Sequence, residues 1–328
     1  MDNSTDPSWD RAWDDRTLDA ALAELADGDI GPACAVLAEA REQPEVRSLR
    51  LEVLAERLVG AGDRVLELAM DEVNPELVLL AGAVALREAR VIADGPLDPN
   101  ALKVAAAYQR RSFGLLAQAA EDVDTDPVPH ELALSIVAGL RPADADAVWG
   151  RVAKRCPTFY TGHRTRVSTL APTDALAFAR ATARAAGSGD PRAALVVLAH
   201  FLGCRAKAAE FLAAGKNADG ALLNARWETF RNPRSGVPGE IAELSQRYLA
   251  AARPHPRAIE AHNLFAAAFS AMGSPELSEP HLRLVVGKPS AWAWRWAGGE
   301  EGYNSAQQAL RGIKHPDLAP EVRNHPLF

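Results

Sequence analysis

Cysteine is scarce in this chain: three residues, Cys34, Cys156 and Cys204, stand among 328. They lie far apart, and no two of them have the CxxC spacing that is typical of zinc sites and redox motifs. An odd number of widely separated cysteines does not build a disulfide framework. We therefore expect reduced thiols, which are typical of a cytoplasmic protein.

The chain also lacks an excess of basic charge and long apolar stretches. It has 36 basic and 43 acidic side chains, a formal net charge of −7, whereas proteins that bind nucleic acids or anionic membranes are normally basic. The longest apolar run, Leu77–Leu86, is about half of what a bilayer-spanning helix needs. The acidic, polar N-terminal residues do not resemble a secretory signal peptide. The sequence predicts a cytoplasmic protein that binds neither nucleic acid nor membrane.

Segments typical of β-strands are missing as well. Alanine dominates the composition, and leucine, arginine and glutamate follow it, which favours helix nearly throughout. Strand-like alternation occurs only at Trp292–Trp296, where tryptophans alternate with alanine and arginine. A lone strand would have no partner, so we expect an extended segment or a short helix there that caps the end of a helical stack. The predicted fold class is all-α.

Two amphipathic helices joined by a short turn are predicted over Ala258–Pro289. Gly273 ends the first helix, as a glycine just past a helix end commonly does. Ser274 and Pro275 then suit the N-cap and the first position of the second helix. One face of the first helix carries His262, Phe265, Ala266 and Phe269.

This hairpin resembles one tetratricopeptide repeat, a helix-turn-helix unit of about 34 residues. The characteristic positions of the repeat are occupied by His262, Phe265, Ala266, Phe269, Gly273, Leu282, Val285 and Pro289. His262 stands where tryptophan is usual, Ser278 stands where alanine is usual, and the closing proline comes one residue early. The resemblance implies stacked antiparallel helical hairpins, an α-solenoid, in an adaptor that binds a protein or peptide on its concave surface.

Further helical pairs are predicted along the chain. They cover Thr17–Pro44, Glu45–Pro75, His130–Leu140 with Ala143–Arg155, and Arg205–Ala214 with Asp219–Phe230, the last pair following a separate helix over Pro191–Leu202. The segment Pro75–Asp94 is apolar on most sides, so we expect a central helix that is packed by neighbours on both flanks.

Three parts are predicted: an acidic N-terminal arm at 1–16, N-terminal hairpins at 17–121, and C-terminal hairpins with a tryptophan-rich cap at 130–328. Trp9 and Trp13 of the arm share a helical face if that segment is helical, and would dock it onto the body. The acidic, proline-bearing stretch Asp122–Pro129 marks the boundary between the second and third parts. A surface loop within one continuous domain explains that stretch equally well.

Catalytic and metal motifs remain incomplete. His130 and Glu131 begin a HExxH zinc motif, but Leu134 occupies the second histidine position. The Asp-rich stretch Asp14–Asp19 resembles a DDxxxD metal motif, yet it lies near the N-terminus without a second ligand set, so an acidic helix start explains it better. We predict no cofactor and no metal site, and we favour a non-catalytic protein.

A cationic cluster is the first candidate site. Its members are Arg151, Arg155, His163, Arg164 and Arg166. Several such groups facing one concavity would hold a carboxylate or phosphate of a partner. The alternative interpretation is a solvated face with local salt bridges.

A buried pocket is the second candidate, in an all-α enzyme or small-molecule-binding protein. Its lining would be His262, His281, Trp292, Trp294 and Trp296. Histidine in such a place can titrate near neutral pH and serve as an acid or base. Two or more histidines and a carboxylate around one closed cavity would favour this function.

Overall fold

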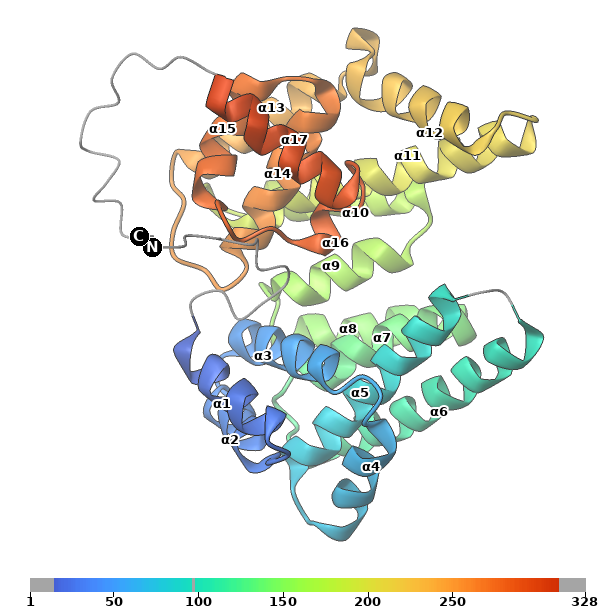
Figure 1. Ribbon diagram of the computed structural model, residues 1–328, viewed down its shortest axis with the longest axis vertical. Helices are drawn as coiled ribbons and strands as arrows, with labels where there is room; N and C mark the ends of the chain where they lie inside the picture. Colours follow the sequence, from blue (N-terminus) through green and yellow to red (C-terminus); the bar gives the residue numbers. More distant parts are fainter. Residues whose placement is uncertain (1–14, 96–97, 313–328) are drawn as a thin grey trace. The chain divides into compact units, whose positions relative to one another are not determined.

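The computed structural model describes residues 15–95 and 98–312 (Figure 1). Within these ranges the chain forms seventeen α-helices, three short 3₁₀ turns and one π-helical turn, without a β-strand. The predicted all-α class is therefore confirmed. Trp9 and Trp13 of the predicted arm lie outside the described residues.

Contacts divide the chain into two compact units that separate between Thr169 and Leu170. The first unit contains α1 Arg16–Ala26, α2 Gly31–Glu39, α3 Pro44–Arg57, α4 Gly62–Asp71, α5 Pro75–Asp94, α6 Pro99–Asp122, α7 Val128–Leu140, η1 Pro142–Asp144, α8 Ala145–Arg155 and α9 Tyr160–Thr169. Its central element is α5, which packs against α2, α3, α4 and α6. The prediction of a central helix over Pro75–Asp94 is thus confirmed.

The stretch Asp122–Pro129, where the sequence predicts a boundary, lies inside the first unit. Asp126 explains why this acidic stretch is a packed connection. Its Oδ1 accepts a hydrogen bond from the N–H of Val128 at 2.9 Å, at the start of α7. Its Oδ2 accepts one from Nε of Arg47 on α3 at 2.8 Å. The buried carboxylate therefore ties the connection to two helices.

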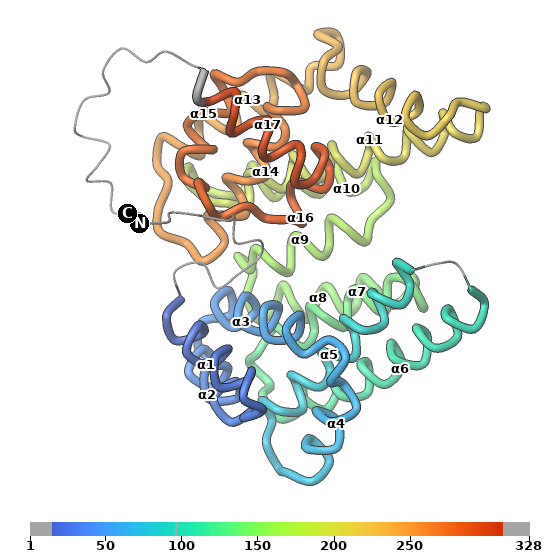
Figure 2. The backbone as a smooth tube through the Cα atoms, viewed as in Figure 1, coloured from blue at the N-terminus to red at the C-terminus, as the bar shows by residue number. Residues whose placement is uncertain are grey.

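The second unit contains α10 Pro172–Ala185, η2 Pro191–Ala194, α11 Leu195–Ala213, α12 Ala218–Arg226, η3 Trp227–Arg231, η4 Pro233–Ser235, α13 Val237–Leu249, α14 Ala258–Met272, α15 Pro275–Leu284, α16 Ala291–Trp294 and α17 Gly299–Gly312. Its central element is α14, which packs against α11, α13, α15, α16 and α17 (Figure 2). The sequence predicts a break after Leu202, but α11 continues through it, because Cys204 and Ala208 extend its buried face.

The predicted hairpin over Ala258–Pro289 is present as α14 and α15. Gly273 has φ +74° and ends α14 in the left-handed conformation, as expected. Ser274 precedes α15, but its side chain makes no capping hydrogen bond. Ser278 is buried at the position where tetratricopeptide repeats carry alanine, and its hydroxyl donates to the carbonyl of Ala266 at 3.1 Å. A small polar residue therefore fits this position without an unsatisfied hydroxyl.

Gly189 permits a close backbone approach in the second unit. Its φ is +80°, and a Cβ on it would overlap the carbonyl oxygen of Ala251. We expect Gly189→Ala to lower the free energy of unfolding by at least about 2 kcal/mol, because the left-handed conformation and the overlap both oppose a side chain. Gly215 is the matched control: its φ is +86°, but its Cβ would meet nothing within 4 Å. Gly215→Ala should cost about 1 kcal/mol in urea unfolding; equal losses in the two variants would contradict the packing argument.

Candidate functional site

The predicted cationic cluster lies on α8 and α9, and three of its members form ion pairs within the first unit. Nη2 of Arg155 lies 2.8 Å from Oδ1 of Asp124. Arg164 pairs with Glu52 of α3, and Arg166 pairs with Asp146 of α8. Arg151, the remaining arginine of the cluster, is exposed.

These ion pairs correspond to the alternative interpretation of the cationic cluster, a face with local salt bridges. They also change what mutations on this face would report. Charge reversal at Arg164 or Arg166 breaks an ion pair that joins two helices, so it alters packing as well as surface charge. A loss of partner binding in such variants would therefore have two explanations.

His163, the fifth member of the cluster, is buried on α9. Its Nδ1 lies 2.8 Å from the carbonyl oxygen of Phe159 and therefore carries the proton in that hydrogen bond. Its ring meets Trp149 edge-on, with centroids 5.0 Å apart. The side chain thus packs between helices and does not face solvent.

The second predicted site is partly brought together, because His262 and His281 are in contact in the core of the second unit. Their Nδ1 atoms lie 2.9 Å apart, so one of the two donates and the other accepts. The hydroxyl of Ser245 lies 2.7 Å from Nε2 of His281. Burial, and next the neighbouring His262, hold the pKa of His281 well below its ordinary value. His281 is therefore neutral at physiological pH.

This order of serine, histidine and histidine has the composition of a nucleophile, a base and an orienting group. However, Ser245 is buried and His281 is fully buried. The ring of His281 stacks on Phe265 at 4.9 Å and on Phe269 at 6.0 Å between centroids. A substrate could reach the serine only if this packing opened, so the arrangement acts as a buried polar contact between α13, α14 and α15.

The tryptophans of the predicted pocket belong to α16 and the turn after it. Trp294 is fully buried, and its Nε1 donates to Oδ1 of Asn263 at 2.7 Å. Trp296 stacks on Phe201 with centroids 6.1 Å apart, and Trp292 is half-buried against the same core. The segment therefore forms a short helix, one of the two predicted conformations, in which Trp294 docks onto α14, while Trp296 of the following turn docks onto α11.

His200 contributes to a different arrangement. Its Nε2 lies 2.8 Å from Oε2 of Glu240, and Nε of Arg180 donates to Oε1 of that carboxylate at 2.6 Å. The hydrogen bond from Arg180 outweighs burial and lowers the pKa of Glu240. A shallow pocket of about 140 Å³ lies beside this ion-paired group, with Arg184 and Arg247 at its edge.

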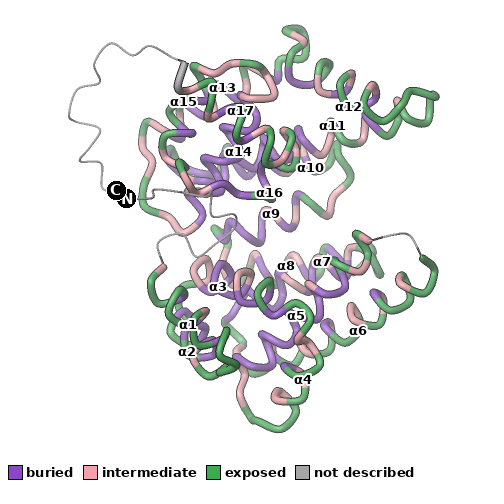
Figure 3. The backbone as a smooth tube through the Cα atoms, in the orientation of Figure 1, coloured by how far each residue is buried: buried purple, intermediate pink, exposed green. Residues whose placement is uncertain are grey.

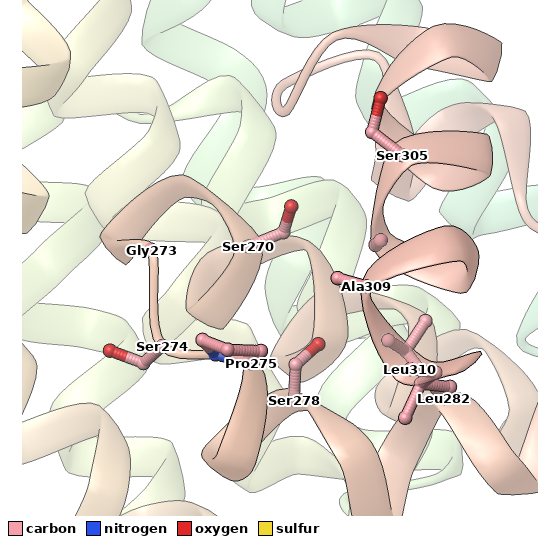
Figure 4. A pocket seen from close by; sticks show the side chains of 10 residues that line it. Ser270, Gly273, Ser274, Pro275, Ser278, Leu282, Ser305, Ala309 and Leu310 are labelled. Carbon is pink, nitrogen blue, oxygen red and sulfur yellow. The ribbon is translucent and has the colours of Figure 1, made fainter. Parts of the chain in front are cut away.

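A larger open pocket lies between α15 and α17 (Figure 4). Its volume is about 180 Å³. We call it the α15–α17 groove; it is lined by Ser270, Gly273, Ser274, Pro275, Ser278, Leu282, Ser305, Ala306, Ala309 and Leu310. Figure 4 shows Leu282 of α15 facing Leu310 of α17. Small residues line most of it, and they do not stand out in a sequence as rich in alanine as this one.

Exposed apolar side chains gather on the hairpin of α11 and α12. We call residues 205–231 the α11–α12 arm. The side chains of Leu223 and Trp227 are 65% and 58% exposed, and Leu212 and Leu222 are exposed nearby. Figure 3 shows the tip between the two helices as exposed. The sequence predicts the helix but not its exposed apolar face, because periodicity alone does not separate a face that packs internally from one that is left open.

The opposite side of α12 accounts for this exposure. Ala221 and Ala225 are fully buried against α11. Leu223 and Trp227 are four residues apart, a spacing that places two side chains on one helical face. Trp227 begins the π-helical turn η3, and such turns are frequent at functional sites.

Comparisons with known proteins give no relative: no family model, no curated protein and no solved structure matches this chain. Among residues 15–95 and 98–312, no helix is both long enough and apolar enough to cross a bilayer. In the same ranges, histidine, cysteine, aspartate and glutamate form no group of three or more that could hold a metal ion.

Proposed function

We propose that this chain is a non-catalytic helical-repeat protein, similar to tetratricopeptide-repeat proteins, that binds another protein or a peptide. The observation that carries the proposal is the open apolar face of the α11–α12 arm, with Trp227 and Leu223 at its centre. Tryptophan is enriched among the residues that dominate binding energy at protein interfaces. Covering a large apolar side chain contributes about 1.5–3 kcal/mol, so a few such residues suffice for a specific contact.

Helical pairing supports the repeat architecture in this proposal. Consecutive helices pack against one another in α1 with α2, α5 with α6, α7 with α8, α11 with α12, and α14 with α15. The last pair has the turn glycine and the small buried residue of the repeat, Gly273 and Ser278. The pair α3 and α4 departs from the pattern, because each packs mainly on α5. In our proposal the stack is an irregular α-solenoid.

The binding face that we propose differs from the cationic cluster. Arg155, Arg164 and Arg166 already pair with carboxylates of their own unit, so a partner would compete with those ion pairs. The apolar side chains of the arm gain burial from a partner without breaking a contact. The arm is therefore the better docking surface.

The double variant Leu223→Ala/Trp227→Ala should lose a partner that the wild-type chain captures. We expect at least a tenfold loss in recovered partner, because truncating a central tryptophan of an interface commonly costs more than 1 kcal/mol. The measurement is affinity capture from native lysate with quantitative mass spectrometry, using the full chain as bait.

Met70→Ala/Val73→Ala provides the matched control. Both residues are exposed apolar side chains, 77% and 107% exposed, at the end of α4 and beyond it. Neither pair of substitutions should change stability by more than about 0.5 kcal/mol per site. Equal recovery of every captured protein with wild type and the arm variant would remove the arm as the binding face.

A further inference from the structure

The α15–α17 groove is open and apolar at its base, and its outer wall is the last described helix. Leu282 of α15, which is buried, and Leu310 of α17, which is half-buried, lie together in its lining (Figure 4). Ala306 and Ala309 present only methyl groups, so the wall of α17 leaves space beside α15. Hydroxyl groups of Ser270 and Ser305 stand at the rim (Figure 4).

The volume of the α15–α17 groove limits the size of the group that it can bind. A cavity of about 150 Å³ with apolar walls is known to accept a benzene ring in another protein. The groove measures about 180 Å³, which suits one large apolar side chain. Serine hydroxyls at the rim are able to hydrogen-bond the backbone of an extended segment that carries such a side chain.

A segment with these properties follows α17 directly in the sequence. Residues 313–328 read IKHPDLAPEVRNHPLF, and they begin three positions after Leu310 of the groove. Their large apolar side chains are Ile313, Leu318, Val322, Leu327 and Phe328, and prolines stand at 316, 320 and 326. Proline at this spacing disfavours helix and favours extended backbone. At about 3.3–3.6 Å per extended residue, six residues already span about 20 Å, which is enough to turn back onto the neighbouring helix.

We propose that the α15–α17 groove is the docking site of the chain's own segment 313–328, which inserts an apolar side chain against Leu282 and Leu310. Attachment to α17 keeps the segment at a local concentration in the millimolar range, so a weak contact is sufficient to populate the docked state. Docking covers the apolar base of the groove and pairs the rim hydroxyls with backbone groups. This surface is separate from the α11–α12 arm and does not depend on the function proposed for it.

Blocking the groove tests the proposal on the chain of residues 1–328. Ala309→Trp fills the space between the two helices, and because Ala309 is exposed the larger side chain does not enter the core. Trypsin cleavage after Arg323 reports docking, since cleavage of a transiently released segment follows the population of its open form. We expect cleavage about tenfold faster in Ala309→Trp than in wild type, measured by mass spectrometry under native conditions.

Gln308→Trp is the matched control, because residue 308 is exposed on the same helix but does not line the groove. It should cleave at the wild-type rate, and both variants should keep the wild-type melting temperature within about 2 °C. Equal cleavage rates in wild type and Ala309→Trp would overturn the proposal. So would protection in wild type that grows with protein concentration from 1 to 100 µM, since the occupant would then be a second copy.

Discussion

Arg47→Met is expected to lower the free energy of unfolding by about 3–5 kcal/mol, which is the usual cost of removing one partner of a buried ion pair. Arg47 is 1% exposed. Its Nε lies 2.8 Å from Oδ2 of Asp126, its Nη1 lies 3.3 Å from Oε1 of Glu76, and it also donates to the carbonyl of Leu37. The variant leaves two buried carboxylates without this cation.

The pKa values of the two carboxylates show how each depends on its neighbours. Burial raises the pKa of Asp126 even though Arg47 opposes the shift. For Glu76, burial is outweighed by the hydrogen bond from Arg41 and by the charge of Arg47, so its pKa lies below the ordinary value. Asp126 forms its ion pair with Arg47 and joins the start of α7 to α3. We therefore expect Arg47→Met to destabilise the connection between α6 and α7, which contains Asp126, before other parts of the unit.

Arg41→Met is the control for this prediction. Arg41 also pairs with Glu76, with Nη2 and Oε2 2.6 Å apart, but its side chain is 42% exposed. Solvent screens such a pair, so the variant should lose about 1 kcal/mol or less. Urea unfolding at neutral pH, followed by circular dichroism, measures both variants. Losses of about 1 kcal/mol in each would show that burial of Arg47 does not matter.

Glu131→Gln is expected to change how stability depends on pH, by about 3 kcal/mol between pH 5 and pH 8. Glu131 of α7 is buried, and its Oε1 accepts a hydrogen bond from the hydroxyl of Thr165. Burial raises its pKa from 4.5 to about 7, although Arg164 and the hydrogen bond from Thr165 oppose this shift. The folded chain therefore keeps a proton that the unfolded chain releases above about pH 4.5.

Because of this difference in proton binding, the contribution of Glu131 to stability decreases as the pH rises. The stability that Glu131 contributes is complete below pH 4.5 and is lost as the pH rises through about 7. Glutamine does not titrate, and its carbonyl oxygen can still accept from Thr165. The variant should thus gain stability relative to wild type as the pH rises. Glu121→Gln, at an exposed position of α6, should leave the pH dependence unchanged. Parallel unfolding free energies of wild type and Glu131→Gln at pH 5, 6.5 and 8 would contradict a raised pKa.

The sequence predicts the local elements well, because each depends on residues near one another in the chain. Pro75–Asp94 is a helix with the predicted bounds, since Asn74 caps it and Pro75 begins it. Gly273 ends α14 as predicted, because glycine adopts the left-handed conformation without the steric cost of a side chain. The all-α class follows from the alanine-rich composition, which favours helix independently of packing.

The sequence predicts the sites less well than the local elements, because the sites depend on contacts between distant segments. Arg164 and Arg166 belong to a cationic run in the sequence, but their carboxylate partners come from α3 and α8. His262 and His281 do meet, because the hairpin that the sequence predicts brings α14 and α15 together. Whether that pair lies in a cavity or in a closed core depends on Phe265, Phe269 and other packing residues around it.

The sequence by itself therefore determined the helical class, helix ends such as Pro75 and Gly273, and the pairing of neighbouring helices other than α3 and α4. These features follow from backbone preferences and the spacing of apolar residues. Only the tertiary structure decided that Asp126 is buried, that burial raises the pKa of Glu131, and that Trp227 remains exposed at the start of η3. The physical reason is that desolvation depends on every segment that covers a side chain, and those segments come from anywhere in the chain.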